Sequence, residues 1–387
     1  MPDPKEELGI EFVNKQISDY YSTAKYIAPD RMSEREFGVG NFETKIARRH
    51  ISFKSENELR NYLSGNSVPY VSCSAAYYKY PDGRPMENKG WLGSELVFDL
   101  DSTDMDLVCQ RAHGRSWVCK NCLNSVKGET IKLIYDFLIP DFGFSESDIQ
   151  VNFSGSRGYH VHIKKESVLQ LDAASRREIS NYISGIGMDF QEFFPTAGQR
   201  GMMLSGPRPS DKGWKGKIAR NFLSNLNAGI DSLSSMGIDR TMATKLYRKK
   251  SLIEMGIRNG NWDMVYIKNK ADFWKGIIDR QAVSQSDKID KNVTNDPSHL
   301  IRLPNTIHGG TGLLAKRLGD AKDLYRFDPM KDAIAFKKGQ VRISANTNFE
   351  IVMAGQRYGP YGGEINVPMY VAMYLFLKGN ARLLREV

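Results

Sequence analysis

A short apolar segment that ends in two aspartates constrains this chain most. The run from Glu95 to Asp101 reads Glu-Leu-Val-Phe-Asp-Leu-Asp, which is typical of a buried β-strand. Side chains alternate between the faces of a strand, so Asp99 and Asp101 point the same way while the apolar residues face a core. Two carboxylates ~6–7 Å apart repel each other unless a cation lies between them, and Mg²⁺ or Mn²⁺ suits such oxygen ligands. The alternative is a strand that ends in two solvated aspartates.

A cysteine- and histidine-rich segment follows this strand. Cys109, His113, Cys119 and Cys122 provide four soft ligands, and the last two form a Cys-x2-Cys pair. Zn²⁺ binds four such ligands tetrahedrally, and a site filled by protein ligands is structural rather than catalytic. The sequence therefore predicts a structural zinc site, against the alternative of scattered cysteines beside a chance histidine. Cys73 remains as a buried thiol.

A glycine-rich turn is the second polar cluster. It reads Ser-Gly-Ser-Arg-Gly-Tyr-His over residues 154–160 and joins strands predicted at 149–153 and 159–163. Its glycines let backbone amides approach an anion, while Ser154, Arg157 and His160 add further donors. These groups suit a triphosphate, although taken alone the pattern also fits a simple turn with a solvated arginine.

The third cluster lies far along the chain, between Asp290 and His308. Asp290 is a candidate third carboxylate, and Arg302 lies in a short strand-like segment where it could meet a phosphate. His308 precedes two glycines, where a loop can approach a ligand closely. Together the three clusters resemble the parts of a two-metal nucleotidyl transferase, in which metal ions and cations stabilise a transferring phosphoryl group.

Composition and charge agree with that chemistry. The 387 residues carry 54 basic and 45 acidic side chains, a formal net charge of +9, which favours an anionic partner such as nucleic acid or nucleotides. The first 30 residues mix charged and apolar side chains and do not read as a signal peptide. The apolar run from Val367 to Leu377 is too short to span a bilayer. We therefore expect a cytoplasmic protein with no membrane partner.

The motifs resemble those of the catalytic (small) subunit of archaeal and eukaryotic DNA primase. The matching pieces are the Glu95–Asp101 strand, the 154–160 turn and the segment from Asp290 to His308, in the family's order and with the Cys/His segment after the first. Shorter pieces also match near the amino terminus, at Arg35–Phe37, Arg49–Phe53 and Met86–Trp91. The resemblance covers roughly residues 33–315, and the paired histidines at 160 and 162 are typical of archaeal members.

The resemblance implies roles for individual residues. The two catalytic ions, Mg²⁺ or Mn²⁺, would be held by Asp99, Asp101 and Asp290. The phosphates of the incoming nucleotide would be bound by Ser154, Arg157, His160, Arg302 and His308. Glu36 and Arg49 would lie near the active centre. Ser156 stands where some relatives carry a second arginine, so fewer charges would grip the phosphates.

The resemblance also implies a fold and a domain organisation. The fold class would be α/β (α+β), a primase-type mixed-sheet platform flanked by helices, with a zinc knob and a smaller helical lobe. Gly, Ser, Lys and Arg become common and apolar spacing turns helical between about 190 and 285. We thus expect the platform in 1–190 with the knob at 107–124, the lobe in 191–285, and the rest of the platform with a C-terminal segment in 286–387.

The expected activity is template-directed synthesis of short RNA primers on single-stranded DNA for replication, with deoxynucleotides as further possible substrates. The expected partners are the template, nucleoside triphosphates, replication proteins and the large primase subunit in a heterodimer. Two alternatives stay open. One is a repair-type primase-polymerase that extends existing ends, and the other is a non-catalytic zinc protein that binds nucleic acid through its basic surface.

Overall fold

The computed structural model describes residues 4–197, 201–286 and 288–386. Within them the chain forms two compact units. One comprises the residues up to Thr130, Glu146–Arg176 and the chain from Asp290 onward, and the other comprises Ile131–Ser145 and Arg177–Ile289. We call the first the platform unit and the second the helical unit. The predicted lobe at 191–285 falls within the helical unit, which also takes in two earlier segments.

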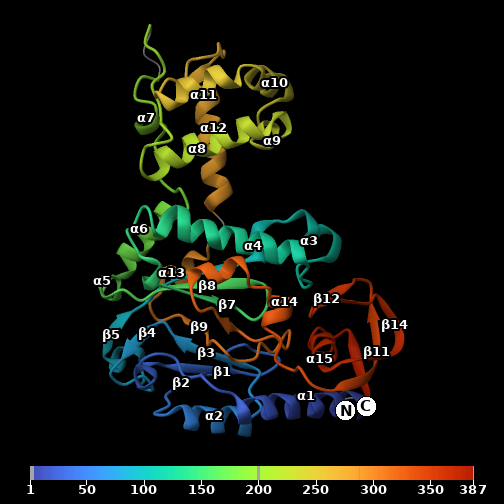
Figure 1. Ribbon diagram of the computed structural model, residues 1–387. Helices are drawn as coiled ribbons and strands as arrows, with labels where there is room; N and C mark the ends of the chain where they lie inside the picture. The colour runs from blue at the N-terminus through green and yellow to red at the C-terminus, as the bar shows by residue number, and fades with distance from the viewer. Residues whose placement is uncertain (1–3, 198–200, 287, 387) are drawn as a thin grey trace. The chain divides into compact units, whose positions relative to one another are not determined.

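Two four-stranded antiparallel sheets form the centre of the platform unit (Figure 1). The first has the order β2 (Arg48–Ile51), β1 (Phe37–Gly40), β3 (Tyr70–Ser74) and β9 (Leu300–Arg302). The second has the order β10 (Lys316–Arg317), β7 (Ile149–Phe153), β8 (Gly158–Ile163) and β6 (Leu96–Asp101). The strands β4 (Ala76–Tyr78) and β5 (Trp91–Ser94) form an antiparallel pair that lies between β3 and β6 in the sequence. The predicted mixed α/β fold class is confirmed.

The strand β6 has the burial pattern that its sequence predicts. Leu96, Phe98 and Leu100 are at most 1% exposed, whereas Asp99 and Asp101 are partly accessible. The predicted strand–turn–strand at 149–163 is present as β7 and β8. Asp172 caps the helix α6 (Ala173–Ile183) as expected, by accepting a hydrogen bond from the Ser175 amide at 2.7 Å.

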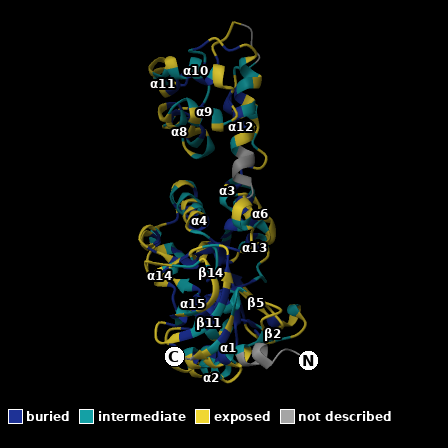
Figure 2. Cartoon of the chain, turned by 90° about the vertical axis from the view of Figure 1, so that its right-hand side faces the viewer, coloured by how far each residue is buried: buried dark blue, intermediate teal, exposed yellow. Residues whose placement is uncertain are grey.

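The residues after Arg317 complete the platform unit with a third sheet. It has the order β14 (Tyr361–Pro368), β11 (Gln340–Thr347) and β15 (Ala381–Glu386), and α15 (Met369–Leu377) packs against it. The apolar run noted in the sequence forms the end of β14 and this buried helix (Figure 2, buried residues dark blue). The long helix α1 (Pro4–Thr23) contacts β15, and Phe12 meets Phe376 edge-on with ring centroids 6.0 Å apart.

Shorter elements connect the sheets of the platform unit. They are the helices α2 (Glu56–Gly65), α3 (Val108–His113), α5 (Glu166–Leu169), α13 (Lys291–Asn295) and α14 (Pro329–Asp332) and the hairpin of β12 (Ile351–Met353) and β13 (Gln356–Tyr358). The helix α4 (Lys120–Lys132) continues as a π-helix over Leu133–Leu138, where the sequence predicts one regular helix at 126–138.

The helical unit has its own aromatic core. Besides the end of α6, its helices are α7 (Phe190–Phe193), α8 (Gly213–Ala228), α9 (Ile230–Ser235), α10 (Arg240–Arg248), α11 (Lys250–Arg258) and α12 (Lys270–Ser286). Phe222, Trp262 and Trp274 are buried at its centre, with the two indole rings 4.7 Å apart. The 131–145 segment joins this unit because Phe137 packs on Trp214 and Lys217 pairs with Asp141. Sequence periodicity cannot reveal such contacts between distant segments.

Candidate active site

Three of the predicted site residues form an acidic cluster at the end of β6. Asp99 and Asp101 lie on the same face of this strand. Asp290 reaches them from the far end of the chain, since its backbone amide donates to the Asp99 carbonyl at 2.9 Å. Its side chain caps α13 by accepting from the Asn292 amide at 2.9 Å. The structure therefore brings the three predicted carboxylates to one place.

The cluster is electrostatically strained without a cation. Burial, together with the nearby charges of Asp101, Asp290 and Asp104, raises the pKa of Asp99 to about 8. Burial and the neighbouring Asp101 and Asp290 likewise raise the pKa of Asp104. Carboxylates gathered so closely that their charges oppose the ionisation of Asp99 and Asp104 are a donor set suited to hard divalent cations. Sequence reasoning did not single out Asp104, although it lies three positions after Asp101.

His160 lies directly across the sheet from Asp99. The two residues are opposite each other in the β6–β8 register, and His160 Nε2 is 3.6 Å from Asp99 Oδ1. Burial, with His162 and Arg302 nearby, holds the pKa of His160 well below its usual value, so the ring is neutral at physiological pH. Its Nδ1 is buried and has no hydrogen-bond partner among the described residues.

The 154–158 turn places Arg157 beside the acidic cluster. Arg157 Nε is 3.0 Å from Asp101 Oδ1, and its Nη1 donates to the Arg115 carbonyl at 2.9 Å. Ser154 Oγ accepts from the Gly158 amide at 3.1 Å and so closes the turn. Gly155 has a φ of +87°, and a Cβ there would stand 2.7 Å from the Cβ of His308. Only glycine lets the turn lie this close to His308.

Arg302 and His308 share an aromatic neighbour, Tyr70. The Arg302 guanidinium lies 4.8 Å from the Tyr70 ring centroid, and the His308 ring meets the same ring edge-on at 5.2 Å. Burial lowers the pKa of Arg302 to about 10, which leaves it charged at physiological pH. Burial and four cations hold the pKa of His308 well below its usual value; these are Arg302, Lys45, Lys378 and Arg157.

Those pKa effects identify residues that the sequence did not. The charge of Lys45 lowers the pKa of both Asp99 and His308, and the charge of Lys378 lowers the pKa of His308. Neither lysine stands in a motif, and each reaches the site only through the fold. The positive charge around His308 is therefore greater than the predicted Arg157 and Arg302 alone provide.

The predicted zinc ligands also come together. Cys109 Sγ and Cys122 Sγ are 3.5 Å apart, as are Cys122 Sγ and His113 Nε2, and Cys119 Sγ is 3.7 Å from Cys122 Sγ. Burial works against ionisation of Cys119, but the Cys122 amide and His113 hold its pKa below the usual thiol value. A tetrahedral cage of three sulfurs and one nitrogen fits Zn²⁺. Cys73 is buried and free, as predicted.

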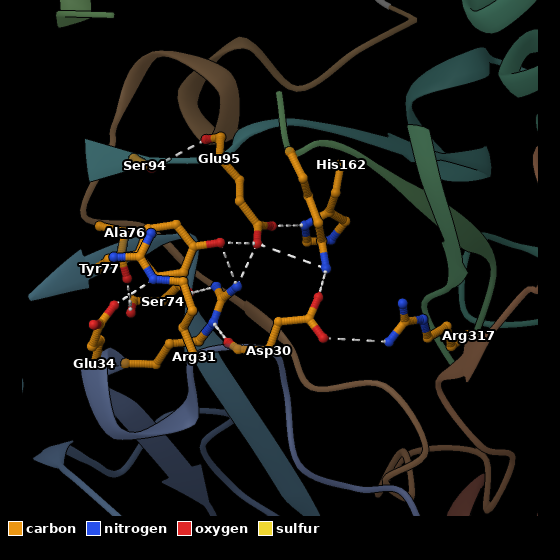
Figure 3. A network of polar contacts seen from close by, with 12 residues as sticks. Asp30, Arg31, Glu34, Ser74, Ala76, Tyr77, Ser94, Glu95, His162 and Arg317 are labelled. Carbon is orange, nitrogen blue, oxygen red and sulfur yellow. Dashed lines mark hydrogen bonds and ion pairs between the residues drawn. The ribbon is translucent and has the colours of Figure 1, made fainter. Parts of the chain in front are cut away.

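A buried ionic network lies next to the site strands (Figure 3). Glu95 is 1% exposed and pairs with Arg35, while its Oε2 lies 2.7 Å from His162 Nδ1 and its Oε1 accepts from Tyr77 at 2.8 Å. Burial opposes ionisation of Glu95, but Arg35 and His162 hold its pKa well below the usual value. This network anchors β8 at a point two residues from His160.

Glu36 and Arg49, which the resemblance places near the active centre, form a second ionic group. The fully buried Glu36 accepts from Arg49 Nε at 2.7 Å and pairs with Lys89 at 3.1 Å. Arg49 Nη2 also lies 3.5 Å from the Ser298 carbonyl, in the segment between Asp290 and Arg302. The pair thus joins the amino-terminal sheet to the third motif.

No helix in the described part of the chain combines the length and apolar character of a membrane span.

Comparisons with known proteins find similarity to one family. A family model described as the DNA primase small subunit matches residues 98–320. The DNA primase small subunit of Methanococcoides burtonii is 34% identical over 392 residues, which cover 96% of this chain and 97% of the relative. That of Methanothrix thermoacetophila is 35% identical over 396 residues, with 96% and 98% covered. The chain is thus similar to these relatives over nearly its whole length.

Proposed function

The chain belongs to the DNA primase small subunit family, and we propose that it synthesises short RNA primers on single-stranded DNA by two-metal nucleotidyl transfer. The observation that carries this proposal is the hydrogen bond from the Asp290 amide to the Asp99 carbonyl. It supports a shared role for three carboxylates that are distant in sequence.

The acidic cluster would hold two Mg²⁺ or Mn²⁺ ions through Asp99, Asp101 and Asp290. Bound there, the ions would activate the attacking 3′-hydroxyl and neutralise charge on the transferring phosphate. The fit rests on the donor chemistry, since the raised pKa of Asp99 marks a carboxylate that needs a counter-charge. We assign Zn²⁺ a structural role at Cys109, His113, Cys119 and Cys122, because protein groups would fill all four positions.

The neighbouring polar groups would bind the incoming nucleotide. Arg157 and Arg302 would attract its phosphates, and the neutral His160 and His308 would orient them by hydrogen bonds. Ser154 would donate its hydroxyl proton to the same anion while its Oγ accepts from the Gly158 amide. Positioning and electrostatic stabilisation by fixed groups would supply most of the rate.

Partners follow from the same proposal. The template would be single-stranded DNA, the substrates ribonucleoside triphosphates and in addition deoxynucleotides, and the chain would act with a large primase subunit and other replication proteins. The net charge of +9 supports a nucleic-acid partner.

The decisive experiment is primer-free synthesis on single-stranded DNA. Ribo- and deoxynucleotides are supplied separately with Mg²⁺ or Mn²⁺, with and without the large subunit. New oligonucleotides that disappear in Asp99→Ala would support the proposal. Extension of an added primer without new starts, even with the large subunit, would instead indicate a repair-type primase-polymerase. Salt-sensitive DNA binding with no metal-dependent synthesis would indicate a non-catalytic protein.

A further inference from the structure

The segment between two zinc ligands holds two cations of the site. Residues 114–118, here called the zinc loop, lie between His113 and Cys119. The carbonyl of Arg115 accepts from Arg157 Nη1 at 2.9 Å, and the carbonyl of Ser116 accepts from Lys378 Nζ at 2.8 Å. Adjacent carbonyls of one loop therefore bind side chains from the 154–158 turn and from the residue after α15.

The zinc loop is held from two sides. On one side its neighbours His113 and Cys119 belong to the ligand cage. On the other, Trp117 is 9% exposed and packs on Phe349 and Tyr374, with ring centroids 5.7 and 6.0 Å away. Its carbonyls consequently have a fixed direction as long as both anchors remain in place.

In the described part of the chain, Lys378 is a cation without an anionic partner. Among the described residues it forms no ion pair with a carboxylate, and its ammonium has two further protons to donate beyond the one that Ser116 accepts. Burial and the nearby Arg157 lower its pKa to about 8. Its charge lowers the pKa of His308, and so does the charge of Arg157, so both cations lie near the same imidazole. A group of cations around a neutral histidine is complementary to a polyphosphate.

We propose that Lys378 binds the phosphates of the incoming nucleotide together with Arg157, and that the zinc loop positions both side chains for this. The inference rests on the proposed function and adds Lys378 to it. Lysine and arginine side chains lose much conformational freedom when an anion orders them. Carbonyls that hold them in advance reduce that loss and so strengthen nucleotide binding.

Binding of a fluorescent ATP analogue to the full chain, with Mn²⁺ present, tests the role of Lys378. We expect Lys378→Gln to weaken affinity about tenfold, the loss typical of a hydrogen bond between charged groups. Lys338→Gln is the matched control, because Lys338 is an exposed lysine of the same unit, and it should leave affinity unchanged. Equal affinities of the two variants would overturn the assignment of Lys378. If the wild-type chain itself fails to bind the analogue, the proposed function fails first.

The zinc loop is tested by loosening it without touching a ligand or a cation. Trp117→Leu removes the aromatic anchor, so we expect weaker binding of the analogue while zinc content and near-wild-type circular dichroism are retained. The loss of affinity that Trp117→Leu causes should be several-fold smaller in a Lys378→Gln background, because one of the positioned groups is then gone. An equal effect in both backgrounds, or no effect in the wild type, would overturn the positioning role. Removing zinc with a chelator, and then removing the chelator before Mn²⁺ is added back for the assay, should weaken binding in the wild type more than in Lys378→Gln.

Discussion

The Asp290 amide donates a hydrogen bond to the Asp99 carbonyl at 2.9 Å and so joins the third motif of the chain to the first. This bond uses backbone atoms only, so it engages neither carboxylate. The whole of the Arg177–Ile289 segment of the helical unit lies between the two residues in sequence. The acidic cluster is consequently a product of the tertiary fold, although each of its members is recognisable locally.

Replacing Asp99 by asparagine should separate metal binding from folding. The substitution removes a carboxylate whose pKa burial and like charges raise to about 8, so the metal-free variant should be at least as heat-stable as the wild type. Mn²⁺ should raise the melting temperature of the wild type but not of Asp99→Asn. Primer synthesis should fall by about 10²–10³-fold or more. Asp106→Asn, an exposed neighbour, is the control and should keep the Mn²⁺ response.

Arg302→Met should affect nucleotide binding more than the chemical step. The guanidinium is buried against the Tyr70 ring and close to His308, where it can attract a phosphate. Loss of a charged hydrogen-bond donor costs about 1.5–3 kcal/mol, which corresponds to a KM for nucleotide raised roughly 10- to 100-fold. Steady-state kinetics measure this; a normal KM with lowered kcat would contradict a role in ground-state binding.

Glu95→Gln should destabilise the platform unit strongly. It leaves the buried Arg35 without its counter-charge, and breaking one side of a buried pair costs about 3–5 kcal/mol. The exposed pair of Arg31 and Glu34 provides the control, since Glu34→Gln should cost about 1 kcal/mol or less. Urea unfolding followed by circular dichroism compares the two.

The Glu95 carboxylate should also make the stability of the folded protein depend on pH. Because the folded state holds the pKa of Glu95 well below the value of 4.5 expected for an unfolded chain, its contribution is present above pH 4.5. It is lost as the pH falls through the lower folded pKa. Thermal unfolding at graded acidic pH should show a steeper loss for the wild type than for Glu95→Gln, and parallel curves would refute this.

Cys119→Ser should abolish zinc binding. Three remaining ligands hold Zn²⁺ poorly, and the 105–125 region should become sensitive to proteolysis while the β6 carboxylates keep their Mn²⁺ response. Elemental analysis of the purified wild type should find zinc, and its absence there would count against the site. Cys73→Ser is the control, because Cys73 is a free buried thiol outside the cluster.

Nucleotide affinity should depend on pH through Lys378. Its pKa of about 8, lowered by burial and Arg157, means that the ammonium loses its proton as the pH rises from 7.5 to 9.5. His308 stays neutral over this range, so it adds no pH dependence to the affinity. Affinity for the ATP analogue should fall about tenfold in the wild type and little in Lys378→Gln. Equal slopes would assign the effect to another group.

Local pattern was enough for the strands and turns that carry the motifs. The alternation in β6, the glycines of the 154–158 turn and the ligand spacing around Cys119 are all short-range signals, and the structure contains each predicted element. The alternation of Val341, Ile343 and Ala345 with polar residues in β11 is an equally local strand signal in the C-terminal segment, and the structure buries all three side chains.

Other features depend on contacts that no window of sequence contains. Tyr70, Lys45 and Lys378 reach the site from three separate segments, and none of them belongs to a motif. The neutral state of His160 follows from burial by neighbouring strands rather than from its own sequence. The Phe137–Trp214 contact likewise assigns the 131–145 segment to the helical unit, because packing decides it.

The strand β9 pairs with β3 inside the first sheet, with Arg302 opposite Ser72. On the ribosome, chains grow from the amino terminus, and units that are already complete fold first. The first sheet would thus lack its last strand until Arg302 had been translated, and the acidic cluster would lack its third carboxylate until Asp290 had been translated. The nascent chain would remain catalytically silent while the helical unit was being made, and the site would assemble only as the third motif emerged.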